Sequence, residues 1–388
     1  MFQDVLVPPR DALQSLGAAP ALVAPSCLLV LFLAQPSRIL NLTLLPLFLA
    51  SALYTSLAYT TGSPPDDYGR ASLNFSLCLI ALDRFVVASP NFEVVFHKSA
   101  AEPTPPAWSW RRLGWALKMM MSMRGAGWSW QVSGVPTGGA DLSRGRFVRS
   151  RLLRTAMLYI VMDAVSTYMQ SLPYFHRQVS LASLSFVERQ INMLSACAAG
   201  ALAIAMLHSA LSALCVASGA WSPGECPDLF GPLSAASSLR GFWSKTWSVF
   251  DPHQSFRRPF TTIPRAVLSL LRLSPASPFT TFLSISFAFF LSALQHAFAV
   301  YAMDRRGRGA MLFFCIQPLG ILAETLVSRA SKGAGGRSLR NAVGYAWTAC
   351  WLLNTCTVFF DELAGMWEVD PAPFSVVKGL TTGQWLSK

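Results

Sequence analysis

The sequence has few charged side chains for its length. Only 13% of its 388 residues are Asp, Glu, Lys or Arg, against about 25% in an average soluble domain. Hydrophobic residues make up 53% of the chain, and the mean hydropathy is +0.41. An ordinary soluble domain does not have this balance, whereas a protein that crosses a lipid bilayer does.

The cysteines are not arranged in pairs, and the first residues do not show the pattern expected of a cleavable leader. The eight cysteines stand singly, mostly inside apolar runs, and none belongs to a Cys-x-x-Cys pair. The sequence therefore predicts neither a disulfide framework nor a zinc cluster, and we expect no metal site. The N-terminus has no basic segment followed by a small-residue cleavage site, so we expect its first apolar run to be a retained membrane span.

Acidic residues are outnumbered by basic ones, and the formal net charge is +12. Nucleic-acid-binding proteins share such a balance, but here the basic residues lie between apolar runs and show no repeated pattern for stacking on bases. Positive loops beside membrane spans explain the charge instead. We therefore expect a lipid bilayer, and no nucleic acid, as the partner.

Apolar runs that approach the roughly 20 residues needed to cross a bilayer recur along the chain. They predict an all-α, polytopic membrane helix bundle with about eight transmembrane helices. The predicted spans lie near residues 18–35, 39–60, 71–88, 152–170, 193–217, 279–302, 310–327 and 343–360.

Two long connections, residues 89–151 and 217–278, are rich in proline, tryptophan and basic residues. The excess of positive charge predicts that both are cytosolic and carry interfacial helices. The short basic link "DRRGRG" at residues 304–309 conflicts with this topology, because strict alternation places it on the lumenal side. Either this link turns into the protein or one of the predicted spans is wrong.

Polar side chains inside two late spans point to a functional site, because they are costly in hydrocarbon. Ser292, Gln295 and His296 lie within one turn of the sixth span. Gln317 and Glu324 are seven residues apart, and so share one face of the seventh span. An intramembrane glutamate needs a cation, a water-filled cavity or a proton.

Two earlier spans add Asp83 beside Arg84, and Asp163. With the late spans they predict a polar chamber within the bundle. Two structural explanations stay open. In the first, His296 has no catalytic role and only forms a hydrogen bond between helices. In the second, Asp83 and Arg84 only anchor the end of a span.

The second long connection contains a segment, Cys226 to Phe260, in which aromatic rings alternate with cations. The rings are Phe242, Trp243, Trp247, Phe250 and Phe256, and the cations are Arg240, Lys245, Arg257 and Arg258. Such a mixture suits the membrane–water interface. Asp251 and Pro252 predict the start of a helix, so His253 falls in its first turn, where the helix dipole favours neutral imidazole. The alternative is an interfacial helix with a surface histidine.

The succession of motifs resembles a known family. "LFGPLSAASSLRGFW" and "HQSFRR" are followed by "FFLSALQHAFAVY", while "MRGAGWSW", the Tyr159–Asp163 pair, "FFCIQPLGILAE" and "NAVGYAWT" stand in order around them. Over roughly residues 70–360 this is similar to the wax-synthase branch of the membrane-bound O-acyltransferases. In fungi that branch includes enzymes that acetylate terpenoid and meroterpenoid metabolites. The resemblance implies an acyltransferase domain over residues 71–388, after N-terminal spans in residues 1–70.

The chain departs from the family pattern at one point. The family usually has Trp-His-Gln contiguous, whereas here Ser248 to Pro252 separate Trp247 from His253. Either the loop carries an insertion and His253 keeps the family role, or Ser248 occupies that place. We favour the insertion, because Gln254 and Arg257 continue the expected pattern.

The resemblance implies acyl transfer from a coenzyme A thioester, here acetyl-CoA as a co-substrate, to the hydroxyl of a hydrophobic alcohol. His296 is expected to be the general base, and His253 or Gln254 to polarise the thioester carbonyl. The other residues expected to contact the substrates are Ser292, Gln295, Gln317 and Glu324. No serine or cysteine lies in a nucleophile motif, so direct transfer is expected, with no cofactor bound permanently.

Arg240, Lys245, Arg257 and Arg258 are expected to bind the phosphates of coenzyme A, or else to face lipid headgroups. We expect a multi-pass protein of the endoplasmic reticulum membrane. Three alternatives remain: a wax synthase that uses long acyl chains, a transporter with Glu324, Asp163 and His296 as relay groups, and a non-catalytic scaffold.

Overall fold

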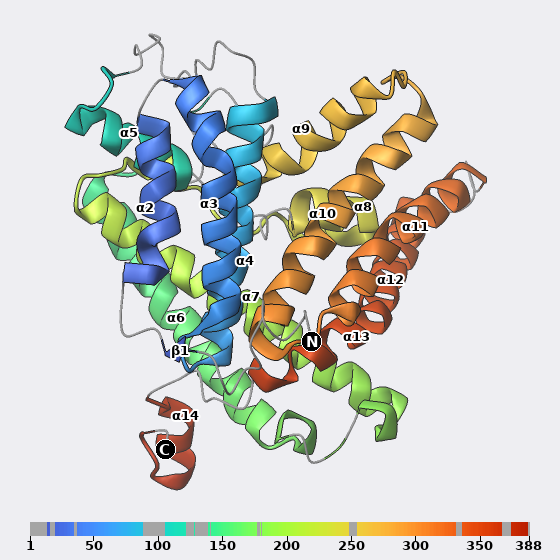
Figure 1. The fold of residues 1–388 in the computed structure, drawn as a ribbon. Helices are drawn as coiled ribbons and strands as arrows, with labels where there is room; N and C mark the ends of the chain where they lie inside the picture. Colours follow the sequence, from blue (N-terminus) through green and yellow to red (C-terminus); the bar gives the residue numbers. More distant parts are fainter. Residues whose placement is uncertain are drawn as a thin grey trace. The chain divides into compact units, whose positions relative to one another are not determined.

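The structure is a computed structural model, and it describes residues 14–15, 20–34, 37–87, 105–121, 128, 139, 141–176, 179, 181–247, 254–330, 336–366 and 374–386. Nearly all the regular structure in these residues is helical, as expected from the sequence (Figure 1). The chain divides into two compact units, and each is described by itself. Unit 1 comprises residues 1–135 and 251–323, and unit 2 comprises residues 136–250 and 324–388.

Unit 1 takes its helices from two stretches of the chain. Its elements are β1 (Gln14–Ser15), α2 (Pro20–Ala34), α3 (Arg38–Ala58), β2 (Tyr59–Thr60), α4 (Pro64–Leu82), the π-helix η2 (Asp83–Val87), α5 (Trp110–Met121), α9 (Gln254–Leu270), α10 (Pro278–Asp304) and most of α11 (Arg308–Ala330). The two-residue strands β1 and β2 pair in parallel.

Local sequence signals set several helix ends in unit 1. Ser37 caps α3, since its hydroxyl oxygen accepts the N–H of Leu40 at 3.3 Å. Helices α4 and α10 begin with proline, where the missing N–H costs no helical hydrogen bond. Helix α10 ends at Asp304, and its C-cap residue Arg305 has a left-handed backbone with φ 55°. The ends of α10 lie within two residues of the predicted sixth span.

The core of unit 1 lies among α2, α3, α4 and α5. Leu29, Phe48 and Leu77 are each at most 1% exposed there. Trp128, from the "MRGAGWSW" motif, is equally buried and packs on Trp115 with ring centroids 5.7 Å apart. Lipid tails are as apolar as these side chains, so close packing is the main attraction between helices within a membrane.

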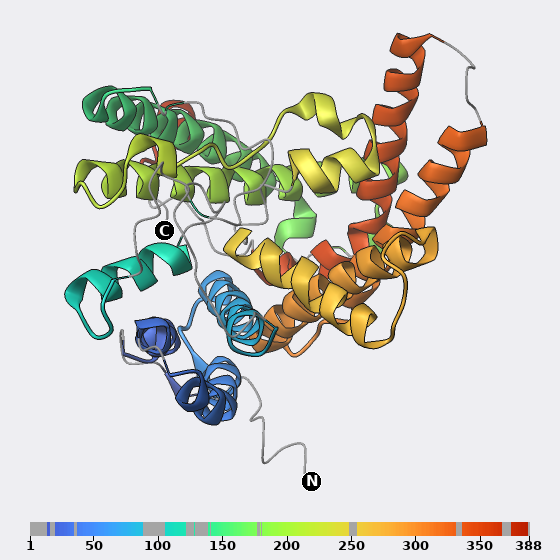
Figure 2. The ribbon, with the colours of Figure 1, turned by 90° about the horizontal axis from the view of Figure 1, so that it is seen from above.

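Unit 2 is built on two long neighbouring helices, α6 (Arg144–Gln170) and α7 (Phe186–Ala217), which run side by side (Figure 2). Its other elements are η3 (Pro173–His176), η4 (Leu181–Ser183), η5 (Pro223–Glu225), η6 (Leu233–Ser237), α8 (Leu239–Gly241), the π-helix η7 (Phe242–Thr246), α12 (Arg337–Thr355), α13 (Thr357–Glu362), η8 (Ala364–Met366) and α14 (Val376–Thr382). A capping box of Ser185 and Glu188 starts α7.

Four helices among the described residues are long and apolar enough to cross a membrane: α3, α7, α10 and α11. They coincide with four of the predicted spans, and α2 is a shorter apolar helix at the place of another. The remaining three predicted spans fall on α4, α6 and α12, whose first turns carry charges such as Asp67, Arg144 and Arg337. The count of about eight transmembrane helices is therefore not confirmed.

The domain boundary expected at residue 70 falls inside α4, and the division into two domains stays a prediction.

The basic link "DRRGRG" turns at least one arginine into the protein. The guanidinium of Arg305 donates to the carbonyl oxygen of Leu57 at 3.1 Å, at the C-terminal end of α3. Arg306 pairs with Asp304 at 2.9 Å. The carbonyl groups at a helix C-terminus carry partial negative charge, so an arginine there is stabilised by the protein itself. This agrees with the first of the two explanations for the link.

Candidate active site

His296 lies in the C-terminal half of α10 and is partly buried between residues of two other helices of unit 1. Its Nδ1 atom is 2.6 Å from the hydroxyl oxygen of Tyr68 on α4. Its ring stacks on Phe314 of α11, with centroids 4.5 Å apart and planes 6° from parallel. Both contacts reduce the free-energy cost of placing an imidazole in an apolar helix, because Tyr68 supplies a hydrogen bond and Phe314 an aromatic ring for stacking.

Gln295 is buried beside His296 in α10 and forms hydrogen bonds with α4, the helix that carries Tyr68. Its Nε2 atom donates to the hydroxyl oxygens of Ser72 at 3.0 Å and Ser76 at 2.9 Å. Tyr68, Ser72 and Ser76 are spaced four residues apart, so they form one polar line along α4. The spacing of this line is readable in the sequence, but Tyr68 precedes the span predicted from residue 71, so the line was not among the predicted site residues.

Two other residues expected to contact the substrates, Ser292 on α10 and Gln317 on α11, also lie in unit 1. Ser292 is partly buried one turn before His296 and on the same face. Gln317 is fully buried in α11 and donates to the carbonyl oxygen of Phe313 at 2.8 Å. Pro318 follows it, and its missing N–H breaks the helical hydrogen-bond ladder at this depth. Contact of either polar side chain with a substrate stays a proposal.

Glu324 belongs to unit 2 and meets backbone N–H groups. Its carboxylate accepts the N–H of Leu239 at 2.6 Å, and the N–H of Arg240 as well. These groups open the short helix α8, so the acidic side chain satisfies donors that the helix itself leaves unpaired. From the sequence, only a cation, a water-filled cavity or a proton was expected as a partner for Glu324. The observed partner is the backbone of the segment Cys226 to Phe260, called the motif loop from here on.

Three glycines of the resemblance motifs hold that loop in a tight form. A Cβ atom on Gly231 would lie 2.0 Å from the carbonyl oxygen of Lys245, and one on Gly241 would lie 2.1 Å from that of Ala235. On α12, a Cβ atom on Gly344 would lie 2.0 Å from the carbonyl oxygen of Ser237. Any side chain would clash at these backbone approaches, so the glycines of "LFGPL", "LRGFW" and "NAVGYAWT" permit the close packing of this loop and of α12.

The four cations expected to bind coenzyme A are divided between the units. Arg240 and Lys245 are exposed on α8 and η7 of unit 2. Arg258 lies on α9 of unit 1, where its Nε atom is 2.8 Å from a carboxylate oxygen of Asp83. His253, and the side chains of Gln254 and Arg257, lie outside the described residues.

Asp83 and Asp163 both have specific partners. Besides Arg258, Asp83 accepts a hydrogen bond from the hydroxyl of Thr262 on α9 and lies 3.6 Å from Arg84. It therefore joins α9 to the end of α4, which is more than an anchor at a span end. In unit 2, Asp163 accepts the N–H of Val377 at 2.9 Å and so holds the start of α14.

The motif loop contains one cysteine close to ionised groups, Cys226. Burial raises the pKa of its thiol to about 12. At neutral pH the thiolate, which is the nucleophilic form, is therefore scarce. This agrees with transfer that does not pass through an acyl-cysteine at this position.

Comparison with known proteins identifies the family. The model of the membrane-bound O-acyl transferase family matches residues 226–316, a range that includes the motif loop and His296. Acetyltransferase eriL of Hericium erinaceus is 31% identical, with 94% of this chain and 96% of that protein covered.

Two further relatives carry related names. Acetyltransferase ple2 of Rhodocybe pseudopiperita is 29% identical over 86% of this chain and 89% of its own. O-Mevalon transferase macI of Penicillium terrestre is 26% identical over 75% and 73%. No solved structure matches. The chain belongs to the membrane-bound O-acyltransferase family and is an acyl-transferring membrane enzyme.

Proposed function

We propose that the enzyme transfers an acetyl group from acetyl-CoA to a hydroxyl of a hydrophobic terpenoid or meroterpenoid alcohol, with His296 as the general base. The observation that carries this proposal is the setting of His296. It stands inside the family-matched range, and its Nδ1 atom is 2.6 Å from a tyrosine hydroxyl. Several relatives that match most of the chain are named acetyltransferases.

The reaction has one demanding proton transfer. The alcohol oxygen attacks the thioester carbonyl, the C–O bond forms, and Nε2 of His296 takes the hydroxyl proton. The C–S bond then breaks, and the imidazolium returns the proton to the departing thiolate. Atoms balance as alcohol plus acetyl-CoA giving ester plus coenzyme A. General-base catalysis of this kind typically contributes about 10²–10⁴-fold to the rate.

The surrounding residues have supporting roles in this proposal. Ser292, Gln295 and Gln317 of unit 1 shape or contact the substrate chamber. Glu324 of unit 2, whose carboxylate accepts the N–H of Leu239, is a separate candidate for substrate contact. His253 or Gln254 polarises the thioester carbonyl as negative charge develops on its oxygen. The alcohol enters from the bilayer, and the apolar helices α3, α7, α10 and α11 support an integral membrane position. We place the protein in the endoplasmic reticulum membrane.

Cations for the coenzyme phosphates are ranked by their surroundings. Arg240 and Lys245 are exposed, so phosphate binding costs them little desolvation. Arg258 is bound to Asp83, whose charge competes with a phosphate for the same guanidinium. Arg240 and Lys245 are therefore the stronger candidates among the described cations, and Arg258 acts chiefly between helices. Arg257 stays a candidate from the sequence alone.

A second candidate acyl group follows from the relatives named O-mevalon transferases, one from Penicillium terrestre and one from Aspergillus niger. By name, those proteins transfer a group bulkier than acetyl. The chain is 26% and 31% identical to them, so an acyl donor larger than acetyl-CoA is a specific alternative within the same reaction class.

The test is a matrix of donors and acceptors. Membranes that contain the wild-type chain are incubated with labelled acetyl-CoA, a bulkier polar acyl-CoA or palmitoyl-CoA, each with terpenoid alcohols and with fatty alcohols. Label that moves from acetyl-CoA to a terpenoid alcohol supports the proposal. Transfer only from the bulkier donor supports the second candidate, and transfer only from palmitoyl-CoA to fatty alcohols identifies a wax synthase.

A further inference from the structure

We infer that Tyr68 is the positioning residue of the catalytic base: its hydroxyl oxygen accepts the Nδ1–H of His296 and so leaves Nε2 unprotonated to take the alcohol proton. This inference rests on the proposed function, because it concerns how His296 performs it. The two residues are 228 positions apart in the chain, and no motif links them.

The imidazole is held on two sides. The Tyr68 hydroxyl lies 2.6 Å from Nδ1, which is the length of a strong hydrogen bond. Phe314 covers one face of the ring, nearly parallel at 4.5 Å. The stack restrains the ring plane, and the hydrogen bond fixes which nitrogen points toward Tyr68. In this inference Nε2, on the other side of the ring, is the nitrogen that takes the alcohol proton.

Helix α4 is fixed against α10 at several points along the same seam. Gln295 bonds two serines one and two turns beyond Tyr68. Ala71, Ala299 and Ala302 are buried together, and their small side chains let the helices approach closely. Movement of Tyr68 away from His296 would therefore disturb the whole seam.

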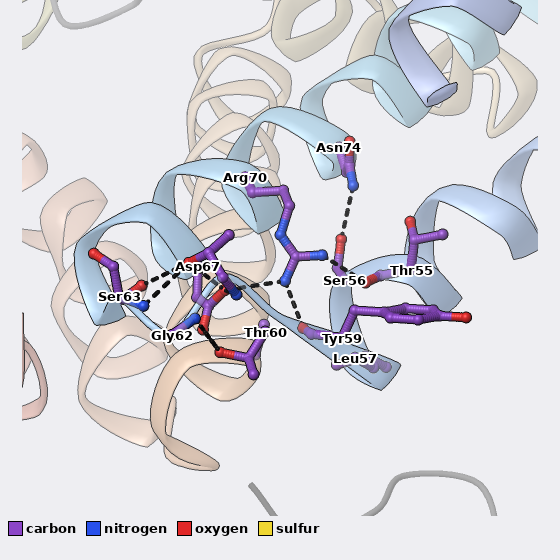
Figure 3. A network of polar contacts seen from close by, with 12 residues as sticks. Thr55, Ser56, Leu57, Tyr59, Thr60, Gly62, Ser63, Asp67, Arg70 and Asn74 are labelled. Atoms are coloured by element: carbon purple, nitrogen blue, oxygen red, sulfur yellow. Dashed lines mark hydrogen bonds and ion pairs between the residues drawn. The ribbon is translucent and has the colours of Figure 1, made fainter. Parts of the chain in front are cut away.

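A buried ionic network also fixes the turn of α4 that carries Tyr68 (Figure 3). Asp67, the residue before Tyr68, accepts the N–H of Thr61 at 2.7 Å and lies 3.2 Å from Arg70. Arg70 donates to the carbonyl oxygens of Thr55 and Tyr59, each at 2.6 Å. These carbonyls lie at the end of α3, so the first turn of α4 is tied to the preceding helix. Such a network positions a side chain more rigidly than a surface turn does.

The tautomer decides what His296 can do. A neutral imidazole carries one proton, so a proton on Nδ1 leaves a lone pair on Nε2. When Nε2 accepts the alcohol proton, the resulting imidazolium keeps its hydrogen bond to the tyrosine oxygen. That bond is stronger to the charged ring than to the neutral one, and so favours the transition state. In the reverse assignment Tyr68 donates to Nδ1, and Nε2 is a donor that cannot act as a base.

The experiment compares Tyr68→Phe with Tyr54→Phe, using the wild type and His296→Ala as references. Tyr68→Phe keeps the ring and removes only the hydroxyl, so packing at the seam is preserved. Tyr54 is an exposed tyrosine on α3, and its substitution removes the same atom elsewhere. Each variant is first compared with the wild type by size-exclusion chromatography in detergent and by thermal stability. Then kcat and KM for the acyl donor are measured.

We expect Tyr68→Phe to lower kcat by about 10- to 100-fold, the effect of one lost hydrogen bond to a charged group, with KM for the acyl donor and the folded fraction unchanged. Tyr54→Phe is expected to match the wild type. Wild-type kcat in Tyr68→Phe beside an inactive His296→Ala overturns this inference alone. Equal losses of kcat and folded protein in Tyr68→Phe also overturn it, since they show a purely structural role. A wild-type chain that transfers no acyl group, or an active His296→Ala, overturns the proposed function and with it this inference.

Discussion

Replacing Asp67 by asparagine removes the negative charge from the network at the start of α4. Asp67 is 1% exposed and Arg70 is 6% exposed, and they lie 3.2 Å apart. Loss of one partner of a buried ion pair typically costs about 3–5 kcal/mol, because the other charge stays buried. Arg70 keeps its two bonds to carbonyl oxygens, so we expect the lower end, about 3 kcal/mol.

The assay is thermal unfolding of the purified protein in detergent, followed by the fraction that remains monodisperse. A loss of about 3 kcal/mol corresponds to a transition lower by roughly 6–12 °C on the scale known for globular domains. Asp66→Asn is the matched control, because Asp66 is the adjacent residue in the same helical turn but is exposed. Equal shifts for the two variants would refute the argument that Asp67 and Arg70 stabilise the turn that carries Tyr68.

Three further predictions concern the motif loop and its cations. Burial raises the pKa of Asp228, but Arg151 and Arg154 lower it more, so the net pKa is below the ordinary value. Its ion pairs therefore stabilise the fold above about pH 4 and lose their effect as the pH falls through the lower folded-state pKa. We expect Asp228→Asn to be less thermostable than the wild type at pH 7 and equal to it at the acid end; a constant difference would contradict this. The double change Arg240→Glu and Lys245→Glu is expected to raise KM for the acyl donor at least about tenfold, and the exposed Arg337→Glu is the control. An unchanged KM would assign the two cations to the lipid surface. His253→Ala is expected to lower kcat more than Ser248→Ala, and the reverse order would show that Ser248 occupies the family's histidine position.

Hydropathy predicted the helices well because it is a local property. The predicted spans at 39–60, 279–302 and 310–327 agree with α3, α10 and α11 to within a few residues at each end. The prediction at 152–170 missed the first turns of α6, which begins at Arg144. Hydropathy places an arginine-rich turn outside a span, but arginine is a good helix former and the helix continues through it.

The partners of the site residues were harder to predict because they come from distant parts of the chain. His296 was identified from its apolar surroundings and from resemblance, yet nothing local pairs it with Tyr68. Glu324 was expected to need a charge or water, whereas backbone N–H groups of α8 supply its partners. That answer depends on how the motif loop folds, and close backbone approaches at three glycines determine that fold.

In the proposed reaction, His296 takes the proton from the alcohol. The most direct measurement is the acyl-transfer rate of purified His296→Ala with the alcohol that the wild type uses best, beside His176→Ala as control. His176 is an exposed histidine of unit 2 that bonds the carbonyl oxygen of Gln170. We expect His296→Ala to be slower by about 100-fold or more at an unchanged folded fraction, and His176→Ala to keep the wild-type rate. A rate in His296→Ala within a few-fold of the wild type would contradict it.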